Sequence, residues 1–339
     1  MNRRTTRSAA VRRARVVLVA ALAAWWSFAG AGEPSIDAEQ RAFAAEVAEA
    51  GGPPAASVLA TLAGARVQSS ILEAIARPAE KKPWKDYRPI FVTEQRIEGG
   101  RAFYREHREL LDRTAREYGV PAEIIVAILG VETRYGNITG KYRVLDALAT
   151  LAFHYPPRAP FFRSELKQLF LLEDMHLAYP IEELKGSYAG AMGWGQFMPS
   201  SIASYARDGD ADQRIDLWES LPDITASVAN YFAAHGWEDG GPVAVRVQPA
   251  DNARHIEPGG LEPVYPVEQM EVWGYAPLVH VDPARVSNLV VLEGEAGDEY
   301  WLTFRNFYVI SRYNRSALYS MAVWQLAEGI ADGVADPRG

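Results

Sequence analysis

Apolar residues recur at three- and four-residue steps along most of the chain, which is the spacing of helices with one buried face. A glycine and proline cluster at 51–54 divides the first helical stretch, and 81–85 is predicted to be a loop. Between 240 and 305 the pattern changes to short β-favouring pieces such as 243–247 and 289–292. The sequence therefore predicts a mainly α (α+β) protein with a small β-rich insert and with helical segments at 35–76 (two helices), 93–118, 121–133, 143–153, 158–175, 198–207, 222–235 and 316–330.

The segment 121–133 is apolar on nearly every face, so it is predicted to be a buried helix. Pro121 stands at its first turn, where a missing N–H is harmless. Glu132 follows the apolar run and has Ile128 and Leu129 one turn before it. Burial would raise the pKa of this carboxyl group and keep it protonated near neutrality, as a general acid requires. The alternative is an ordinary glutamate that is solvated or paired with Arg134.

The segment 187–201 repeats glycine among small and aromatic residues, at Gly190, Gly193 and Gly195. Glycine lets a ligand approach the backbone closely. Ser187 and Gln196 are then candidates to hydrogen-bond a sugar hydroxyl or acetamido group. The alternative is a glycine-rich turn that only packs two helices together.

The first thirty-one residues differ from the rest of the chain. Six arginines precede an apolar run at 16–26, which is shorter than the roughly 20 residues that a membrane span needs. Ala29-Gly30-Ala31 supplies the small residues that an export peptidase reads. We expect 1–31 to be a signal peptide cleaved after Ala31, with a retained anchor as the alternative.

Composition narrows the function classes. With 339 residues, 48% of them hydrophobic and 23% charged, the chain is long enough for more than one globular unit. It has no cysteine, which excludes disulfides and thiolate metal sites and leaves no lipid-accepting cysteine after residue 31. Removal of 1–31 changes the net charge from −8 to −14, because that segment holds six arginines and no acid. We therefore expect a soluble exported protein without a membrane span or lipid anchor, and nucleic acid is a poor candidate partner.

An acidic loop follows at 208–219, with acids at positions 1, 3, 5, 9 and 12 of a twelve-residue stretch. This spacing is close to the calcium loop of an EF-hand, although Gln213 replaces the usual glycine at position 6. The sequence leaves two interpretations open, a structural Ca²⁺ site and a solvated acidic loop. The candidate ligands are Asp208, Asp210, Asp212, Arg214 and Glu219.

Five blocks of sequence, at 130–136, 145–151, 187–201, 227–237 and 306–314, resemble in content and order the lytic murein transglycosylase B family and its soluble relatives. The resemblance runs from about 84 to 330. It implies a lysozyme-like helical core formed by 116–235 and 304–330, which contains the acidic loop 208–223. It also implies an N-terminal helical unit at 32–115 and a β-rich insert at 236–303.

The resemblance further implies a function. In that family the glutamate that matches Glu132 protonates the glycosidic oxygen between N-acetylmuramic acid and N-acetylglucosamine and then acts as base. The C6 hydroxyl of the sugar attacks the anomeric carbon, so a 1,6-anhydro product forms without water and one carboxylate suffices. The implied setting is the periplasm, the implied partner is the peptidoglycan glycan strand, and no cofactor is needed for the chemistry.

Family positions that bind the glycan match Ser187, Gln196, Tyr231, Tyr313, Asn314, Tyr319, Tyr87 and Arg158. Pro157 stands where a second basic residue is expected beside Arg158. The family's calcium loop has a slightly longer spacing, which would make Asp223 a ligand in place of Glu219.

Two other functions remain open at this point. A hydrolytic, lysozyme-like muramidase would need a second carboxylate, and Asp146 and Glu165 are the acids nearest to the motif in sequence. A non-catalytic peptidoglycan-binding scaffold would need no acid at all.

Overall fold

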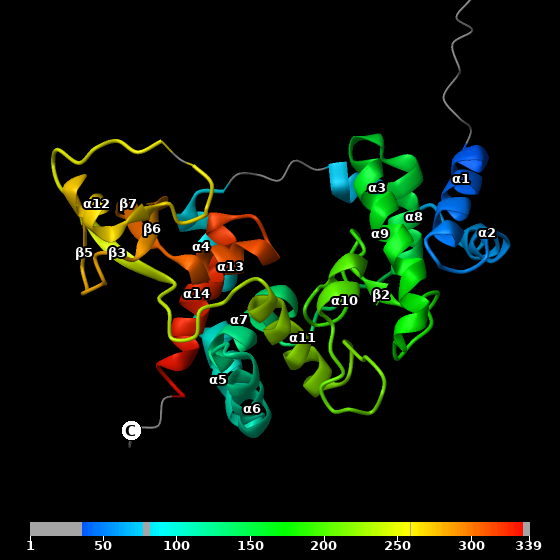
Figure 1. The fold of residues 1–339 in the computed structure, drawn as a ribbon, viewed down its shortest axis with the longest axis horizontal. Helices are drawn as coiled ribbons and strands as arrows, with labels where there is room; N and C mark the ends of the chain where they lie inside the picture. The colour runs from blue at the N-terminus through cyan, green and yellow to red at the C-terminus, as the bar shows by residue number, and fades with distance from the viewer. Residues whose placement is uncertain (1–35, 77–81, 258, 335–339) are drawn as a thin grey trace, which may run out of the picture. The chain divides into compact units, whose positions relative to one another are not determined.

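The structure is a computed structural model, and it describes residues 36–76, 82–257 and 259–334 (Figure 1). The predicted signal peptide lies outside the described residues. Helices dominate, and one five-stranded antiparallel sheet forms between 244 and 303. The predicted α+β class with a β-rich insert is confirmed.

The N-terminal helices α1 (Ile36–Glu49), α2 (Ala55–Ala63) and α3 (Ser69–Ala76) are three where the sequence predicted two. The additional break falls after Gly64, whose N–H bonds to the carbonyl groups at the end of α2. These helices share a core cluster with α8 (Val144–His154) and α9 (Ala159–Leu171), in which the ring of Phe43 lies 5.8 Å from that of Phe153 and 6.1 Å from that of Phe170.

The next helices belong to a different core cluster. Helix α4 (Trp84–Phe91) begins inside the segment predicted to be a loop, with the Trp84 side chain buried. The predicted helix 93–118 is wrong as a single element, because it forms α5 (Glu94–Glu106) and α6 (Arg108–Tyr118). His107 leaves the helical conformation, with φ −112° and ψ 23°, and its ring packs 4.6 Å from that of Phe103.

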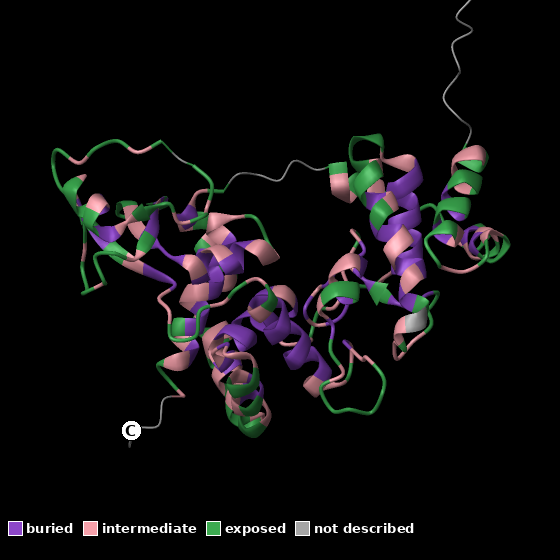
Figure 2. Cartoon of the chain, viewed as in Figure 1, coloured by how far each residue is buried: buried purple, intermediate pink, exposed green. Residues whose placement is uncertain are grey.

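Helix α7 (Ala122–Thr133) is the centre of this second cluster, and its burial confirms the prediction from its apolar sequence. It packs against α5, α6, α11 (Leu221–Ala234) and α14 (Ala317–Ala331). Figure 2 shows α7 and α11 almost entirely in the buried colour. A helix enclosed in this way holds its last turn, which carries Glu132, in a fixed place.

The sheet has the order β4-β6-β7-β3-β5, and its central hairpin pairs Val290 of β6 with Trp301 of β7. The strands are β3 (Ala244–Pro249), β4 (Tyr265–Pro266), β5 (Tyr275–Pro277), β6 (Val286–Gly294) and β7 (Gly297–Thr303). Besides α4, two further short helices were not predicted, α12 (Val267–Val272) within the insert and α13 (Arg305–Tyr313) directly after β7.

The remaining elements are short. They are the paired strands β1 (Tyr142–Arg143) and β2 (Lys185–Gly186), the 3-10 turns η1 (Pro156–Arg158) and η2 (Leu172–Met175), and α10 (Pro199–Tyr205). Over the described ranges, no helix combines the length and apolarity that crossing a bilayer would take. The domain boundaries near 115, 235 and 303 remain predictions.

Candidate active site

Glu132 occupies the last turn of α7, directly after a run of buried residues that extends from Ile124 to Val131. The residue keeps partial solvent access, while the protein surrounds its carboxyl group densely. Burial raises the pKa of Glu132 from 4.5 to about 7. The carboxyl group is thus largely desolvated and still accessible to a ligand, and it carries a proton for much of the time at neutral pH.

Tyr319 contacts this carboxyl group directly. Its hydroxyl donates a hydrogen bond of 2.5 Å to Glu132 Oε1. Tyr319 lies in the first turn of α14, where its backbone N–H is capped by the Ser316 side chain. The bond stabilises the ionised carboxylate and so lowers the pKa of Glu132, an effect smaller than the increase due to burial.

Two more tyrosines lie within the electrostatic reach of Glu132. Burial raises the pKa of Tyr87 on α4 and of Tyr313 on α13, and the negative charge of Glu132 raises both further. Tyr313 donates a 2.5 Å hydrogen bond to the Gly195 carbonyl oxygen. The structure thus gathers Glu132, Tyr87, Tyr313 and Tyr319 from four different helices, and Tyr313 joins this group to the glycine-rich segment.

In the glycine-rich segment, some of the polar groups predicted to bind a ligand form hydrogen bonds within the protein. Gln196 adopts φ +51°, and its Nε2 donates to the carbonyl oxygens of Thr139 and Gly193. Its Oε1 has no hydrogen bond within the described part of the chain, so this amide can accept from a ligand. Ser187 Oγ accepts from the N–H groups of Ala189 and Ala191, which leaves its hydroxyl proton to donate.

Sequence reasoning missed two residues that join α7 to this segment. Thr133 Oγ1 can donate to the carbonyl oxygens of Trp194 at 3.0 Å and of Leu129 at 3.2 Å, and it accepts from the Gly136 N–H at 3.1 Å. The Trp194 indole N–H donates to the carbonyl oxygen of Trp218 at 2.9 Å. The available signals were a threonine next to the candidate acid and a tryptophan between two glycines.

Among the described residues, no hydrogen bond joins the other three predicted binding residues, Tyr231, Asn314 and Arg158, to the Glu132 carboxyl group. Tyr231 is buried behind Tyr313, with ring centroids 4.7 Å apart, and its hydroxyl donates to the Arg312 carbonyl oxygen. Asn314 is exposed directly after Tyr313. Arg158 lies over the rings of Phe161 and Phe162, and no contact among the described residues joins it to Glu132.

The two other candidate acids are engaged elsewhere. Asp146 accepts from Arg143 and from the Arg66 N–H, which attaches the segment before α3 to α8. Glu165 accepts from the N–H and hydroxyl of Ser200 at the start of α10. In the described part of the chain, no other acid contributes to the raised pKa of Glu132.

The acidic loop brings three of its carboxylates together. One carboxylate oxygen each from Asp208, Asp210 and Asp212 lie within 4.8 Å of one another, and all three residues are exposed. Gln213 adopts φ +72°, so it supplies the left-handed conformation for which an EF-hand uses glycine. Glu219 is not part of this cluster, and the Arg214 side chain donates to the Ala178 carbonyl oxygen.

Asp223 is buried and stabilises the acidic loop through hydrogen bonds to two of its backbone N–H groups. It is 1% exposed, and its two carboxylate oxygens accept from the N–H groups of Gly209 and Asp216, each at 2.7 Å. Burial raises the pKa of Asp223, while these two backbone bonds lower it. Asp223 is thus buried and connects Gly209 to Asp216, whereas Asp208, Asp210 and Asp212 are exposed.

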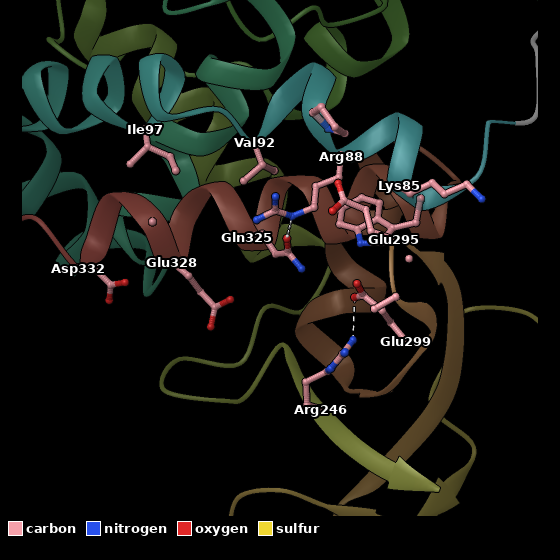
Figure 3. Close-up of a pocket in the computed structure, with 15 residues that line it drawn as sticks. Lys85, Arg88, Val92, Ile97, Arg246, Glu295, Glu299, Gln325, Glu328 and Asp332 are labelled. Atoms are coloured by element: carbon pink, nitrogen blue, oxygen red, sulfur yellow. Dashed lines mark hydrogen bonds and ion pairs between the residues drawn. The ribbon is translucent and has the colours of Figure 1, made fainter.

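A cavity of about 570 Å³ lies elsewhere, between α4, α14 and the β6–β7 hairpin (Figure 3). Its described lining residues include neither Glu132 nor any other predicted site residue. Figure 3 shows Arg246 bonded to Glu299 and Arg88 bonded to Gln325 along its walls. Because no predicted site residue lines it, the cavity is not the candidate active site.

We compared the chain with known protein families. The family described as "Transglycosylase SLT domain" matches residues 35–328. This chain belongs to the transglycosylase SLT domain family. The relationship that the sequence blocks indicated is therefore confirmed.

Individual SLT-domain relatives match over most of this chain. The membrane-bound lytic murein transglycosylase B of Escherichia coli (strain K12) is 44% identical over 248 residues, which are 73% of this chain and 67% of the relative. The soluble lytic transglycosylase SltB1 of Pseudomonas aeruginosa has a TM-score of 0.80 at 44% identity, covering 87% of this chain and 98% of SltB1. The Escherichia coli lytic transglycosylase Slt35 in complex with calcium has a TM-score of 0.79 at 38% identity. The match covers 88% of this chain and 94% of Slt35.

Proposed function

We propose that this SLT-domain protein is a lytic transglycosylase. It cleaves the β-1,4 bond between N-acetylmuramic acid and N-acetylglucosamine in peptidoglycan, with Glu132 as acid and then as base. The observation that carries the proposal is the desolvated carboxyl group of Glu132, which has a pKa of about 7, remains accessible and is bonded to Tyr319. This is the protonation state that a general acid needs near neutrality.

In the proposed reaction, protonated Glu132 gives its proton to the glycosidic oxygen as the bond from that oxygen to C1 of the muramic residue breaks. The hydroxyl oxygen on C6 of the same residue then bonds to C1, and the Glu132 carboxylate accepts the hydroxyl proton. The products are a 1,6-anhydromuramoyl end and a free N-acetylglucosamine hydroxyl. Tyr319 is positioned to stabilise the carboxylate between the two proton transfers, because its hydroxyl donates to that group.

A hydrolytic mechanism has less support. Retaining and inverting hydrolysis both use a second carboxylate, roughly 5 to 9.5 Å from the acid. Asp146 and Glu165 hold backbone N–H groups in other places, and in the described chain no acid adds to the pKa shift of Glu132. Attack by the sugar's own hydroxyl removes the need for a second carboxylate.

The glycan strand is proposed to bind beside the glycine-rich segment. Gln196 Oε1 is available to accept from a sugar hydroxyl or amide, and the Ser187 hydroxyl proton is available to donate. Tyr87 and Tyr313 present rings and hydroxyls near the reacting bond. Asn314 and Arg158 are proposed to contact more distant parts of the substrate, while Tyr231 supports the ring of Tyr313.

For the acidic loop we propose a structural Ca²⁺ site formed by Asp208, Asp210 and Asp212. Exposed carboxylate oxygens at this separation suit a hard cation. The calcium complex of Slt35 supports the assignment. The backbone carbonyl of Arg214 and the carboxylate of Asp223 are the proposed further ligands, in place of Glu219. The periplasm is the proposed location, because that compartment contains peptidoglycan and residues 1–31 have the pattern of a signal peptide.

The direct test is Glu132→Gln. We expect the variant to fold and to bind purified peptidoglycan, and to release no muropeptides when the digest is separated by chromatography. Glu123→Gln, at the other end of α7, is the matched control and should keep its activity. Undiminished lysis by Glu132→Gln would exclude the assignment, and a wild-type protein that binds but never cleaves would favour the scaffold function.

A further inference from the structure

Trp194 is held at three points by residues from two other segments. Its backbone N–H donates to the Leu217 carbonyl oxygen at 3.0 Å, and its indole N–H donates to the Trp218 carbonyl oxygen at 2.9 Å. Its own carbonyl oxygen accepts from Thr133 Oγ1 at 3.0 Å. Trp194 therefore bridges the end of the acidic loop and the residue that follows Glu132.

The indole ring also fills the space beside the turn that ends α7. A Cβ atom built on Gly136 would lie 2.2 Å from atoms of this ring, and Gly136 has φ +81°. Only glycine leaves room for the ring in that conformation. On the other side of Trp194, a Cβ atom on Gly193 would lie 2.5 Å from the Leu217 carbonyl oxygen. The Trp194 ring thus packs against the turn after α7, and the backbone at Gly193 packs against Leu217.

The acidic loop presents its two acceptor carbonyl groups from a fixed position. Asp223 accepts from Gly209 at the start of the loop and from Asp216, which directly precedes Leu217. Asp216 in turn accepts from the N–H groups of Trp218 and Glu219. The carbonyl groups that hold Trp194 are therefore placed by the same carboxylates that give the loop its shape.

We infer that Trp194 is a positioning residue that transmits the conformation of the acidic loop 208–219 to Glu132 through Thr133. The inference rests on the proposed function, because its consequence is for the reaction. In the described part of the chain no hydrogen bond joins Trp194 to Glu132 directly, and in this proposal Trp194 does not touch the substrate. It holds the last turn of α7 against the glycine-rich segment, so that the carboxyl group stays desolvated and aligned.

The first test is Trp194→Phe, which keeps an aromatic ring and removes the N–H donor to Trp218. We expect kcat to fall about 10- to 100-fold with KM nearly unchanged, because misplacement affects the reacting group more than glycan binding. We also expect the alkaline limb of the pH–rate profile to move about one unit toward lower pH, since water reaching the carboxyl group returns its pKa toward 4.5. A protein that merely lost stability would keep the position of that limb.

Trp324→Phe is the matched control. Trp324 lies on α14, and its buried indole N–H has no hydrogen-bond partner among the described residues. We expect this variant to keep the wild-type pH profile. The inference is overturned if folded Trp194→Phe has the kcat and alkaline limb of the wild type, or if Trp324→Phe shifts the limb equally.

A second pair of variants applies if Trp194→Phe does not fold. Thr133→Val removes the hydroxyl that bonds to the carbonyl oxygens of Trp194 and Leu129 and to the Gly136 N–H, while the indole N–H donor of Trp194 is kept. Thr133→Ser restores the hydroxyl. We expect the valine variant to shift the alkaline limb downward and the serine variant to rescue it. Equal profiles for the two variants would contradict the inference.

The role of the acidic loop is tested by a double-mutant cycle with Asp223→Asn, which weakens the bonds that fix Asp216. If Trp194 transmits the loop's conformation, the double variant loses little more activity than Trp194→Phe alone. If the two fold-losses multiply, the coupling is refuted. Analysis of the products formed by the wild type tests the proposed function separately. The shift of the alkaline limb between variants does not depend on which product forms.

Discussion

Replacing Glu132 with glutamine should make the protein more stable, and the gain should grow with pH. The pKa of Glu132 is about 7 in the folded protein, against 4.5 for the free group. Between these values the folded state binds more protons than the unfolded state, so the free energy of unfolding falls as pH rises. At about 1.4 kcal/mol per pKa unit, the ionised carboxylate costs the folded state up to about 3 kcal/mol above pH 7. Glutamine stays neutral and still accepts from Tyr319, so the variant escapes this cost.

The measurement is urea unfolding followed by tryptophan fluorescence, on both proteins at about pH 5 and about pH 8. We expect the stability difference in favour of Glu132→Gln to grow by about 2 kcal/mol between the two conditions. Glu123→Gln, in the first turn of the same helix, is the matched control for replacing a helical glutamate with glutamine. A difference that stays constant with pH would refute the claim that burial raises the pKa of Glu132.

Three further predictions concern the residues around this site. Tyr319→Phe removes a hydrogen bond that lowers the pKa of Glu132, so the alkaline limb of the pH–rate profile should move about one unit toward higher pH. A limb at the wild-type position would contradict this role of the Tyr319 hydroxyl. Asp146→Asn and Glu165→Gln should each lower the free energy of unfolding by about 1–3 kcal/mol while anhydro products continue to form, and a folded variant without activity would reopen the two-carboxylate mechanism. Added Ca²⁺ should raise the Tm of the wild type but not that of Asp210→Asn, and equal shifts would place the cation elsewhere.

The part of the site on α7 could be predicted from the sequence because it depends on local pattern. An uninterrupted apolar run must be buried wherever it packs, so the pattern located both the helix and the polar residue that ends it. The spacing of acids in the loop 208–219 likewise brought Asp208, Asp210 and Asp212 together, since alternate residues of a tight loop point the same way.

What the sequence did not predict depends on tertiary contacts. Helix α13, which carries Tyr313, consists largely of β-branched and aromatic residues, and packing in the core outweighs their strand preference. The break at His107 follows no glycine or proline. Tyr319 is bonded to an acid 187 positions away in the sequence, and Trp194 is held by carbonyl groups that any residue could offer. Such pairs become visible only when the chain is folded.

The measurement that tests the central claim most directly is digestion of purified peptidoglycan in heavy-oxygen water, followed by mass spectrometry of the muropeptides. If Glu132 acts alone and the sugar's own hydroxyl attacks, the products end in anhydromuramic acid and carry no label at C1. Reducing muramic acid ends with heavy oxygen at C1 would show that water is the nucleophile, and would contradict the account.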